Sequence, residues 1–247
     1  MNLNSNSYVL TFAVGMCVVV SATLAFVANN LRPIQESAAE FDRQKNVMVA
    51  AGLCEPTDAR PRAELEKLYQ DRVQEFVVDT KDGTVVQGKS PKDVTELNKA
   101  AAKADKKDEA RYRVVATTRA DGKIESVVLP ISGKGLWSTI YGYLALESDI
   151  DHVRGVTFYK HGETPGLGGE CENPVWCATW RGKSILDEQG KLVGVGVKKG
   201  HVDPNVPAEK AHKVDGLSGA TITSNGITKF VLADLQAFDT YLASLRK

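Results

Sequence analysis

The N-terminal part of the sequence lacks charge: no Asp, Glu, Lys or Arg side chain precedes Arg32. Residues 8–28 form an almost unbroken apolar run, long enough as a helix to cross about 30 Å of hydrocarbon. A cleaved signal peptide would need a basic start and a shorter apolar core, and this N-terminus offers neither lysine nor arginine. We therefore expect a retained, single-span membrane anchor.

An excess of charge of either sign is missing from the whole chain. Its 31 basic and 31 acidic side chains give a formal net charge of zero, and no basic cluster is present. A nucleic-acid-binding protein would present a basic patch or stripe to the phosphate backbone. We therefore expect no nucleic-acid partner.

Cysteine and histidine are scarce, with four of each. Cys171 and Cys177 do not have the spacing of C-x-x-C redox motifs or paired zinc knuckles. A disulfide between them and two buried free thiols both stay open. The histidines form neither an H-x-x-x-H nor an H-E-x-x-H pattern, so we expect no metal site. Ser218 lacks a G-x-S-x-G context, which disfavours a hydrolase.

Apolar periodicity and turn residues predict the elements that follow the anchor. Pro33 is expected to start a new segment with a helix over residues 34–51, and Pro61 to open another. Asp82-Gly83 indicates a hairpin, and residues 89–110 a solvated excursion or short helix. Strands are predicted at 112–118, 124–129, 141–146, 153–159 and 192–197.

Neither internal repeats nor a regular alternation of strands and helices is present. Strands in hairpins, with helices gathered at the ends, predict an α+β fold with a mixed, largely antiparallel sheet and flanking helices. We expect three parts. Residues 1–32 would be the N-terminal tail and transmembrane anchor. Residues 33–110 would be a helical juxtamembrane region with a hairpin and a polar linker, and residues 111–247 the main domain.

The stretch from Asp215 to Gly226 is small, polar and punctuated by glycine, and it leads into an amphipathic helix. Ser224 or Asn225 is expected as the N-cap of that helix. A glycine-rich loop at a helix start offers backbone N–H groups and the positive end of the helix dipole to a phosphate. An ordinary capped helix preceded by a turn is the alternative. The apolar face of the helix contains Ile227, Phe230, Val231, Phe238, Leu242 and Leu245.

The order of residues in this stretch favours the phosphate site. The segment Ser218-Gly219-Ala220-Thr221-Ile222-Thr223 matches the S/T-G-A-T-x-T flavinylation motif, whose last threonine carries FMN through a phosphoester bond. The sequence thus resembles the family of C subunits of the Na+-translocating NADH:quinone oxidoreductase, which is related to the G subunit of the Rnf complex. The resemblance makes Thr223 the residue of covalent FMN attachment, by a flavin transferase that uses FAD. It implies further cofactor contacts by Ser218, Gly219, Ala220 and Thr221.

Two more stretches resemble the same family. Glu163-Thr164-Pro165-Gly166-Leu167-Gly168 combines a Pro-Gly turn with glycines that let the backbone approach a ligand closely. Its N–H groups would bond to the flavin, while Glu163 would orient the loop or the ring, or only cap the turn. In Gly133-Lys134-Gly135-Leu136-Trp137, the last two residues would form an apolar wall against the flavin. A core tryptophan beside a solvated lysine is the alternative. The implied cofactor-binding residues are Glu163, Thr164, Gly166, Leu167, Gly168, Lys134, Leu136 and Trp137.

By this resemblance, residues 111–247 form a covalent FMN-binding domain of an electron-carrying subunit. It would take electrons from an iron–sulfur centre and pass them to the FMN of a neighbouring membrane subunit, coupling NADH oxidation to Na+ export and quinone reduction. The family places this domain on the periplasmic side of the bacterial inner membrane, whereas the basic residues after the span weakly favour the cytoplasm. The equivalent Rnf subunit and a membrane-tethered module with a non-covalent phosphate ligand remain alternatives.

Overall fold

A computed structural model describes residues 6–104, 110–120 and 123–246 of the chain. The chain divides into two compact units, Met1–Arg43 and Gln44–Lys247. The domain boundaries expected after residues 32 and 110 stay a prediction. The second unit begins at Gln44, and its main sheet includes strands from both sides of residue 110.

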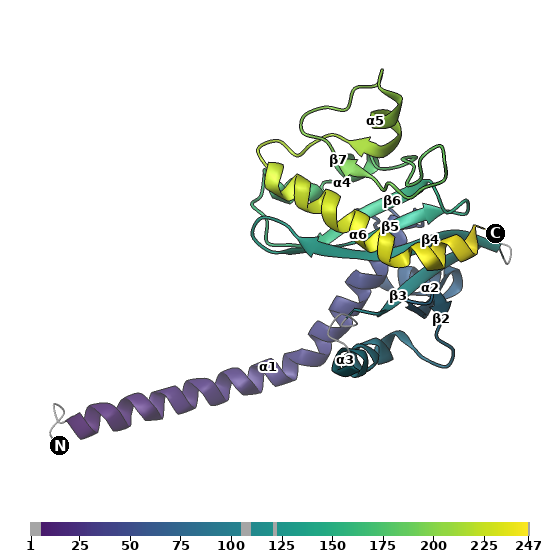
Figure 1. The fold of residues 1–247 in the computed structure, drawn as a ribbon. Coiled ribbons are helices and arrows are strands. Elements are labelled where there is room, and N and C mark those ends of the chain that lie inside the picture. The colour runs from purple at the N-terminus through teal and green to yellow at the C-terminus, as the bar shows by residue number, and fades with distance from the viewer. Residues whose placement is uncertain (1–5, 105–109, 121–122, 247) are drawn as a thin grey trace. The chain divides into compact units, whose positions relative to one another are not determined.

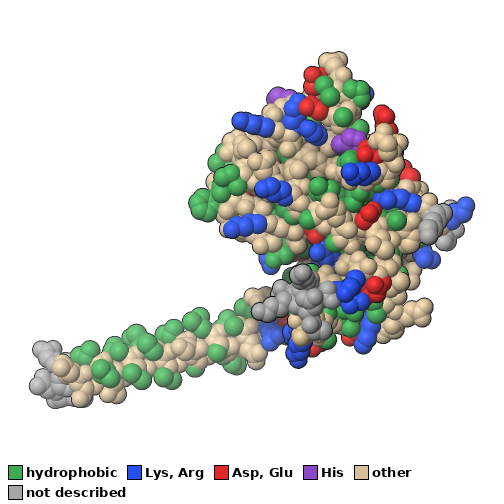
Figure 2. Space-filling view, in the orientation of Figure 1, with side chains coloured by type: hydrophobic (Ala, Val, Ile, Leu, Met, Phe, Trp, Pro, Cys, Tyr) green, Lys and Arg blue, Asp and Glu red, His purple; other side chains and the backbone are tan. Residues whose placement is uncertain are grey.

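The first unit consists of the larger part of α1 (Asn6–Ala50), a continuous helix of 45 residues. Apolar side chains are exposed along it, as the green surface in Figure 2 shows. By length and composition, α1 can cross a membrane. Pro33 lies inside the helix, so the prediction that it starts a new segment is wrong. Proline has no N–H to donate to the carbonyl of Asn29, but both residues are exposed, so that carbonyl stays open to other donors.

The second unit is built on a six-stranded sheet in the order β2-β1-β3-β4-β5-β6, in which every pairing is antiparallel. A short parallel pair lies outside it. The predicted α+β class with a mixed, largely antiparallel sheet is confirmed. The main strands are β1 (Val73–Asp79), β2 (Thr84–Val85), β3 (Tyr112–Ala120), β4 (Lys123–Lys134), β5 (Thr139–Glu147) and β6 (Val153–Lys160), and the parallel pair is β7 (Gly196–Val197) with β8 (Lys213–Val214).

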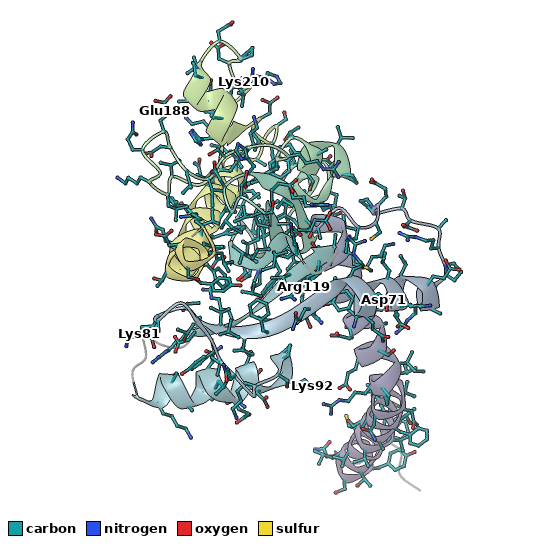
Figure 3. All side chains as sticks on the ribbon, turned by 90° about the vertical axis from the view of Figure 1, so that its right-hand side faces the viewer. Asp71, Lys81, Lys92, Arg119, Glu188 and Lys210 are labelled. Atoms are coloured by element: carbon teal, nitrogen blue, oxygen red, sulfur yellow. The ribbon has the colours of Figure 1, made fainter. Side chains whose placement is uncertain are left out.

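The helices of this unit flank the sheet and its connections. They are α2 (Arg62–Arg72), α3 (Val94–Ala104), α4 (Pro174–Ala178), α5 (Pro207–His212) and α6 (Thr221–Leu245), with 3₁₀ turns η1 (Pro91–Asp93) and η3 (Gly168–Glu172). The hairpin predicted at Asp82-Gly83 joins β1 to β2, and Lys81 lies at this turn in Figure 3. The strand predicted at 192–197 is reduced to its last two residues. Gly194 adopts φ +71° there, a conformation foreign to an extended strand.

The helix α6 lies across one face of the sheet (Figure 1) and encloses the main hydrophobic core with it. Each fully buried aliphatic or aromatic side chain in such a core contributes about 1.5–3 kcal/mol. Gly133 of β4 lets the helix come close, because a Cβ there would lie 2.2 Å from the Cβ of Phe230. Asp234 fixes the helix laterally: its carboxylate accepts the Ser132 N–H at 2.7 Å and pairs with Arg113 of β3.

The end of α1 packs against β6 on the opposite face of the sheet. Val156 of β6 packs in the α6 core, so its neighbour Gly155 faces the other way. A Cβ at Gly155 would lie 2.5 Å from the carbonyl oxygen of Ala50, which means that the helix end rests directly on the strand. Arg154 donates from Nε to the Ala51 carbonyl at 2.7 Å. The end of α1 is therefore part of the second unit.

Candidate functional site

The three stretches singled out in the sequence meet at the first turn of α6. The β4–β5 turn and the end of β6 lie at the same end of the sheet, because Lys134 pairs with Thr139 and Tyr141 with Lys160. Residues 163–168, which follow β6, therefore lie beside residues 134–138. The segment 217–226 reaches the same place: a Cβ at Gly226 would lie 2.4 Å from the carbonyl oxygen of Lys134.

The carboxylate of Glu163 joins these segments. Its Oε2 accepts the Thr223 hydroxyl at 2.6 Å and the Leu136 N–H at 3.2 Å. Its Oε1 accepts the N–H groups of Trp137 at 2.9 Å and Ser138 at 3.3 Å. Both partners of the first bond are buried, with Glu163 5% and Thr223 1% exposed. Burial alone would raise the pKa of Glu163, but the four hydrogen bonds outweigh it and hold the pKa below its ordinary value. The carboxylate is therefore ionised at neutral pH.

The helix α6 begins earlier than predicted. Its first residue is Thr221, and Ala220 occupies the N-cap position without a side-chain hydrogen bond, so the prediction of Ser224 or Asn225 as N-cap is wrong. Thr223 thus lies within the first helical turn, where backbone N–H groups have no acceptor inside the helix. In the described part of the chain, no side chain caps the start of α6. The first turn is instead tied to the loop after β6 by the hydrogen bond from Thr223 to Glu163.

The two last threonines of the motif face different surroundings. Thr221 lines a cavity of about 310 Å³, together with Lys199, His201 and Ser218. Thr223 does not line this cavity; its hydroxyl bonds to Glu163. The positive charge in the cavity is partly offset, because Lys198, which also lines it, pairs with the Glu209 carboxylate. The cavity could bind a phosphate without involving the Thr223 hydroxyl.

The surface around Thr223 is apolar. Leu136, Trp137, Leu167 and Ile222 are exposed large hydrophobic side chains, and they come from all three segments. Trp137 is 70% exposed, which excludes the alternative of a core tryptophan. Exposed apolar and aromatic side chains gathered at one place are typical of a ligand or partner surface. The residues present therefore fit a flat aromatic cofactor held beside Thr223.

Two glycines of the predicted site differ in what they permit. Gly168 lies against the hydrogen bond between Thr223 and Glu163: a Cβ there would lie 2.7 Å from Thr223 Oγ1 and 2.9 Å from Glu163 Oε2. Gly166 has open space around it but adopts φ +75°, which suits the turn. The carbonyl of Thr164 closes that turn by accepting the Leu167 N–H at 3.2 Å.

Other predicted residues lie nearby but make less direct contacts. Lys134 has an exposed side chain and reaches α6 through its backbone. Ser218 and Gly219 are exposed, and a Cβ at Gly219 would lie 2.8 Å from a Leu167 methyl carbon. Sequence reasoning missed Ser138, whose N–H bonds to Glu163. A lone serine after the Leu-Trp pair carries no spacing signal that would have found it.

All four cysteines are free in the structure. The Cys177 thiol donates to the carbonyl of Cys171 at 3.3 Å, and burial raises the pKa of each of these two thiols to about 12. In residues 6–104, 110–120 and 123–246, no group of three or more His, Cys, Asp or Glu side chains is placed to hold a metal ion.

Comparison with known proteins shows to which family the chain belongs. The FMN-binding domain family matches residues 135–236, which include most of the three converging segments. The C subunit of the Na(+)-translocating NADH-quinone reductase of Pseudomonas aeruginosa is 40% identical over 100% of this chain and 98% of its own. The chain belongs to this C-subunit family. The resemblance noted in the sequence is confirmed.

Other members of the family agree with the assignment. The corresponding C subunit of Vibrio parahaemolyticus is 36% identical over 99% of this chain and 97% of its own. The crystal structure of Shewanella oneidensis NqrC is 31% identical, covers 85% of this chain and 99% of its own, and superposes with a TM-score of 0.69. The protein is thus a flavin-carrying subunit of an NADH:quinone oxidoreductase of the Na+-translocating type.

Proposed function

We propose that Thr223 carries FMN through a phosphoester bond to its hydroxyl. The observation that carries the proposal is the position of this hydroxyl, where the three flavin-family segments converge on the first turn of α6. The motif that ends at Thr223 supports it, and so does the family match over residues 135–236. A phosphate on Oγ1 would lie within the first helical turn, where unpaired N–H groups and the helix dipole favour an anion.

The chain's own residues would hold and orient the cofactor. Leu136, Trp137, Leu167 and Ile222 offer the apolar surface for its ring system. The Gly166 turn keeps the backbone of the loop after β6 close to that surface. When bound, FMN supplies reversible electron transfer, for which the protein provides position and electrostatic environment.

In the complex, we assign to this protein the relay of electrons between an iron–sulfur centre and the FMN of the neighbouring membrane subunit. The names of the curated relatives support a Na+-translocating NADH-quinone reductase over an Rnf complex. We place the FMN domain on the periplasmic side of the inner membrane, anchored by α1. There a flavin transferase would load FMN from FAD. Covalent attachment would prevent loss of the cofactor, because free FMN in the periplasm would be too dilute to rebind.

The test compares Thr223→Val with Thr221→Val after co-expression with a flavin transferase. Valine keeps the shape of threonine but has no hydroxyl to receive the phosphoryl group. We expect Thr223→Val to lose the FMN mass completely, at a stability cost of about 1–3 kcal/mol, because Glu163 loses one buried hydrogen-bond donor. Thr221→Val removes an exposed hydroxyl of the same motif and should keep FMN with slower loading.

Intact mass spectrometry and in-gel flavin fluorescence under ultraviolet light provide the readouts. Retention of the FMN mass in Thr223→Val would refute the attachment site. Flavin that co-purifies with the wild-type protein but is lost in the denaturing gel would instead indicate non-covalent binding.

A further inference from the structure

The Thr223 hydroxyl is a weak nucleophile that needs activation. An alkyl hydroxyl is protonated at neutral pH, and attack on phosphorus becomes efficient only when an adjacent base removes its proton. A general base must lie within about 2.6–3.2 Å of the atom that it deprotonates. Glu163 Oε2 lies 2.6 Å from Thr223 Oγ1 and accepts its proton in a hydrogen bond.

We propose that Glu163 is the general base that activates Thr223 for attachment of FMN. This role rests on the proposed function, since it requires Thr223 to be the attachment residue. Oγ1 forms a bond to the FMN phosphorus of FAD, and the P–O bond to the AMP half of the pyrophosphate breaks. The bonding electron pair leaves with AMP, the hydroxyl proton passes to Glu163 Oε2, and no atom is oxidised or reduced.

The surroundings of Glu163 hold its carboxylate in the required place. The N–H groups of Trp137 and Ser138 bind Oε1, so the other oxygen faces Thr223. Glycines enclose the group on two sides: a Cβ at Gly135 would lie 2.6 Å from Oε1, and one at Gly168 would lie 2.9 Å from Oε2. A base fixed in this way needs no reorganisation before it accepts the proton.

The protonation state also suits the role. The hydrogen bonds hold the pKa of Glu163 below its ordinary value despite burial, so the carboxylate is in the basic form at neutral pH. Two titratable groups lie near it. His161 Nδ1 accepts the Glu163 N–H at 3.2 Å, and the thiol of Cys171, with a pKa of about 12, stays neutral. Loss of the Thr223 donor on ester formation removes one contact that lowers the pKa, which favours retention of the proton by Glu163.

A carboxylate that only tied the loops together would make the same static contacts, so the test needs a chemical readout. Full-length protein is mixed with excess flavin transferase and FAD, and the loading rate is followed by intact mass between pH 6 and 9. We expect Glu163→Gln to load about 10²–10⁴-fold more slowly than wild type. Its rate relative to wild type should rise with pH, by up to about tenfold per unit, because hydroxide replaces the missing base.

Two further variants control for structure. Glu163→Asp keeps a carboxylate, so its rate should fall less and its ratio to wild type should not change with pH. Glu170→Gln removes an exposed carboxyl group that bonds to Asn173 and not to Thr223, so its rate should equal that of wild type. Thermal unfolding reports whether each variant is folded.

A Glu163→Gln rate equal to that of wild type, or lowered by a factor that is constant across pH, would overturn the general-base role. If Glu163→Gln does not fold, the Asp variant decides, and a ratio that rises with pH in this variant would also overturn it. Wild-type protein without FMN on Thr223 would instead refute the proposed attachment, which separates the two failures.

Discussion

Gly166 and Gly168 lie two residues apart in one loop, yet the structure predicts opposite effects on FMN loading when each is replaced by alanine. We expect Gly168→Ala to slow FMN loading at least tenfold, because its Cβ would press on both Thr223 Oγ1 and Glu163 Oε2. Gly166→Ala should load at a rate near that of wild type, since its Cβ meets open space. Its backbone at φ +75° disfavours alanine and should cost about 1 kcal/mol of stability.

Loading time courses by intact mass and thermal unfolding of both variants check this prediction. Wild-type loading in Gly168→Ala, or a loading defect in Gly166→Ala without loss of stability, would contradict it.

At the scale of single residues, the sequence predicted Thr223 and Glu163 as site residues but did not predict their contact. The two side chains are 60 positions apart, and no local pattern reports a hydrogen bond over such a distance. Motif resemblance placed both in one site without giving their geometry. Ser138 escaped notice because it acts through its backbone N–H, which every residue type except proline carries.

At the scale of elements, hydrophobic periodicity predicted the body of α6 and most strands of the sheet, and Pro61 marked the start of α2, whereas local rules for helix ends failed at the start of α6 and at Pro33. The predicted N-cap at Ser224 or Asn225 assumes that a side chain ends the helix, but α6 extends to Thr221 without one. The rule that proline ends a helix failed at Pro33 because its lost hydrogen bond falls on an exposed turn. Helix ends depend on tertiary contacts and solvent exposure, which a sequence window does not contain.

The contact between α1 and β6 gives a prediction at this scale. We expect Gly155→Val to destabilise the second unit by about 1–3 kcal/mol, because its Cβ would lie 2.5 Å from the Ala50 carbonyl oxygen and force the helix end away. FMN loading should be unchanged, since Gly155 lies on the face of the sheet opposite α6.

Denaturant unfolding and loading by mass measure the two effects. Thr139→Val, an exposed position on β5, serves as a control that should leave both unchanged. A loading defect in Gly155→Val with normal stability would show that α1 and the site are coupled.

At the scale of the whole molecule, the boundary between the two units lies within α1. The first buried side chain of α1 is Val47, and the second unit begins at Gln44. We therefore expect a fragment that starts at Pro33 to fold, remain soluble without detergent and accept FMN from the transferase. The apolar run that it lacks has no part in the core or in the converging segments.

Circular dichroism, size-exclusion chromatography and intact mass check this fragment against the full chain in detergent. A folded fragment that takes up no FMN when the full chain does so would show that the anchor has a role in loading.

The burial of the Thr223 hydroxyl has a consequence for the timing of maturation. With Thr223 as the proposed attachment residue, its 1% exposure would make the closed protein a poor substrate, and a flavin transferase would act on molecules whose cover has opened locally. Each additional 1.4 kcal/mol or so of opening free energy reduces the fraction of such molecules about tenfold. Amide hydrogen exchange at Leu167 and Gly169, whose N–H groups bond to the Thr164 carbonyl and not to the Glu163 carboxylate, would then proceed in step with loading. The same cover would keep water from the finished ester, so slow attachment and a long lifetime of the ester would share one structural cause.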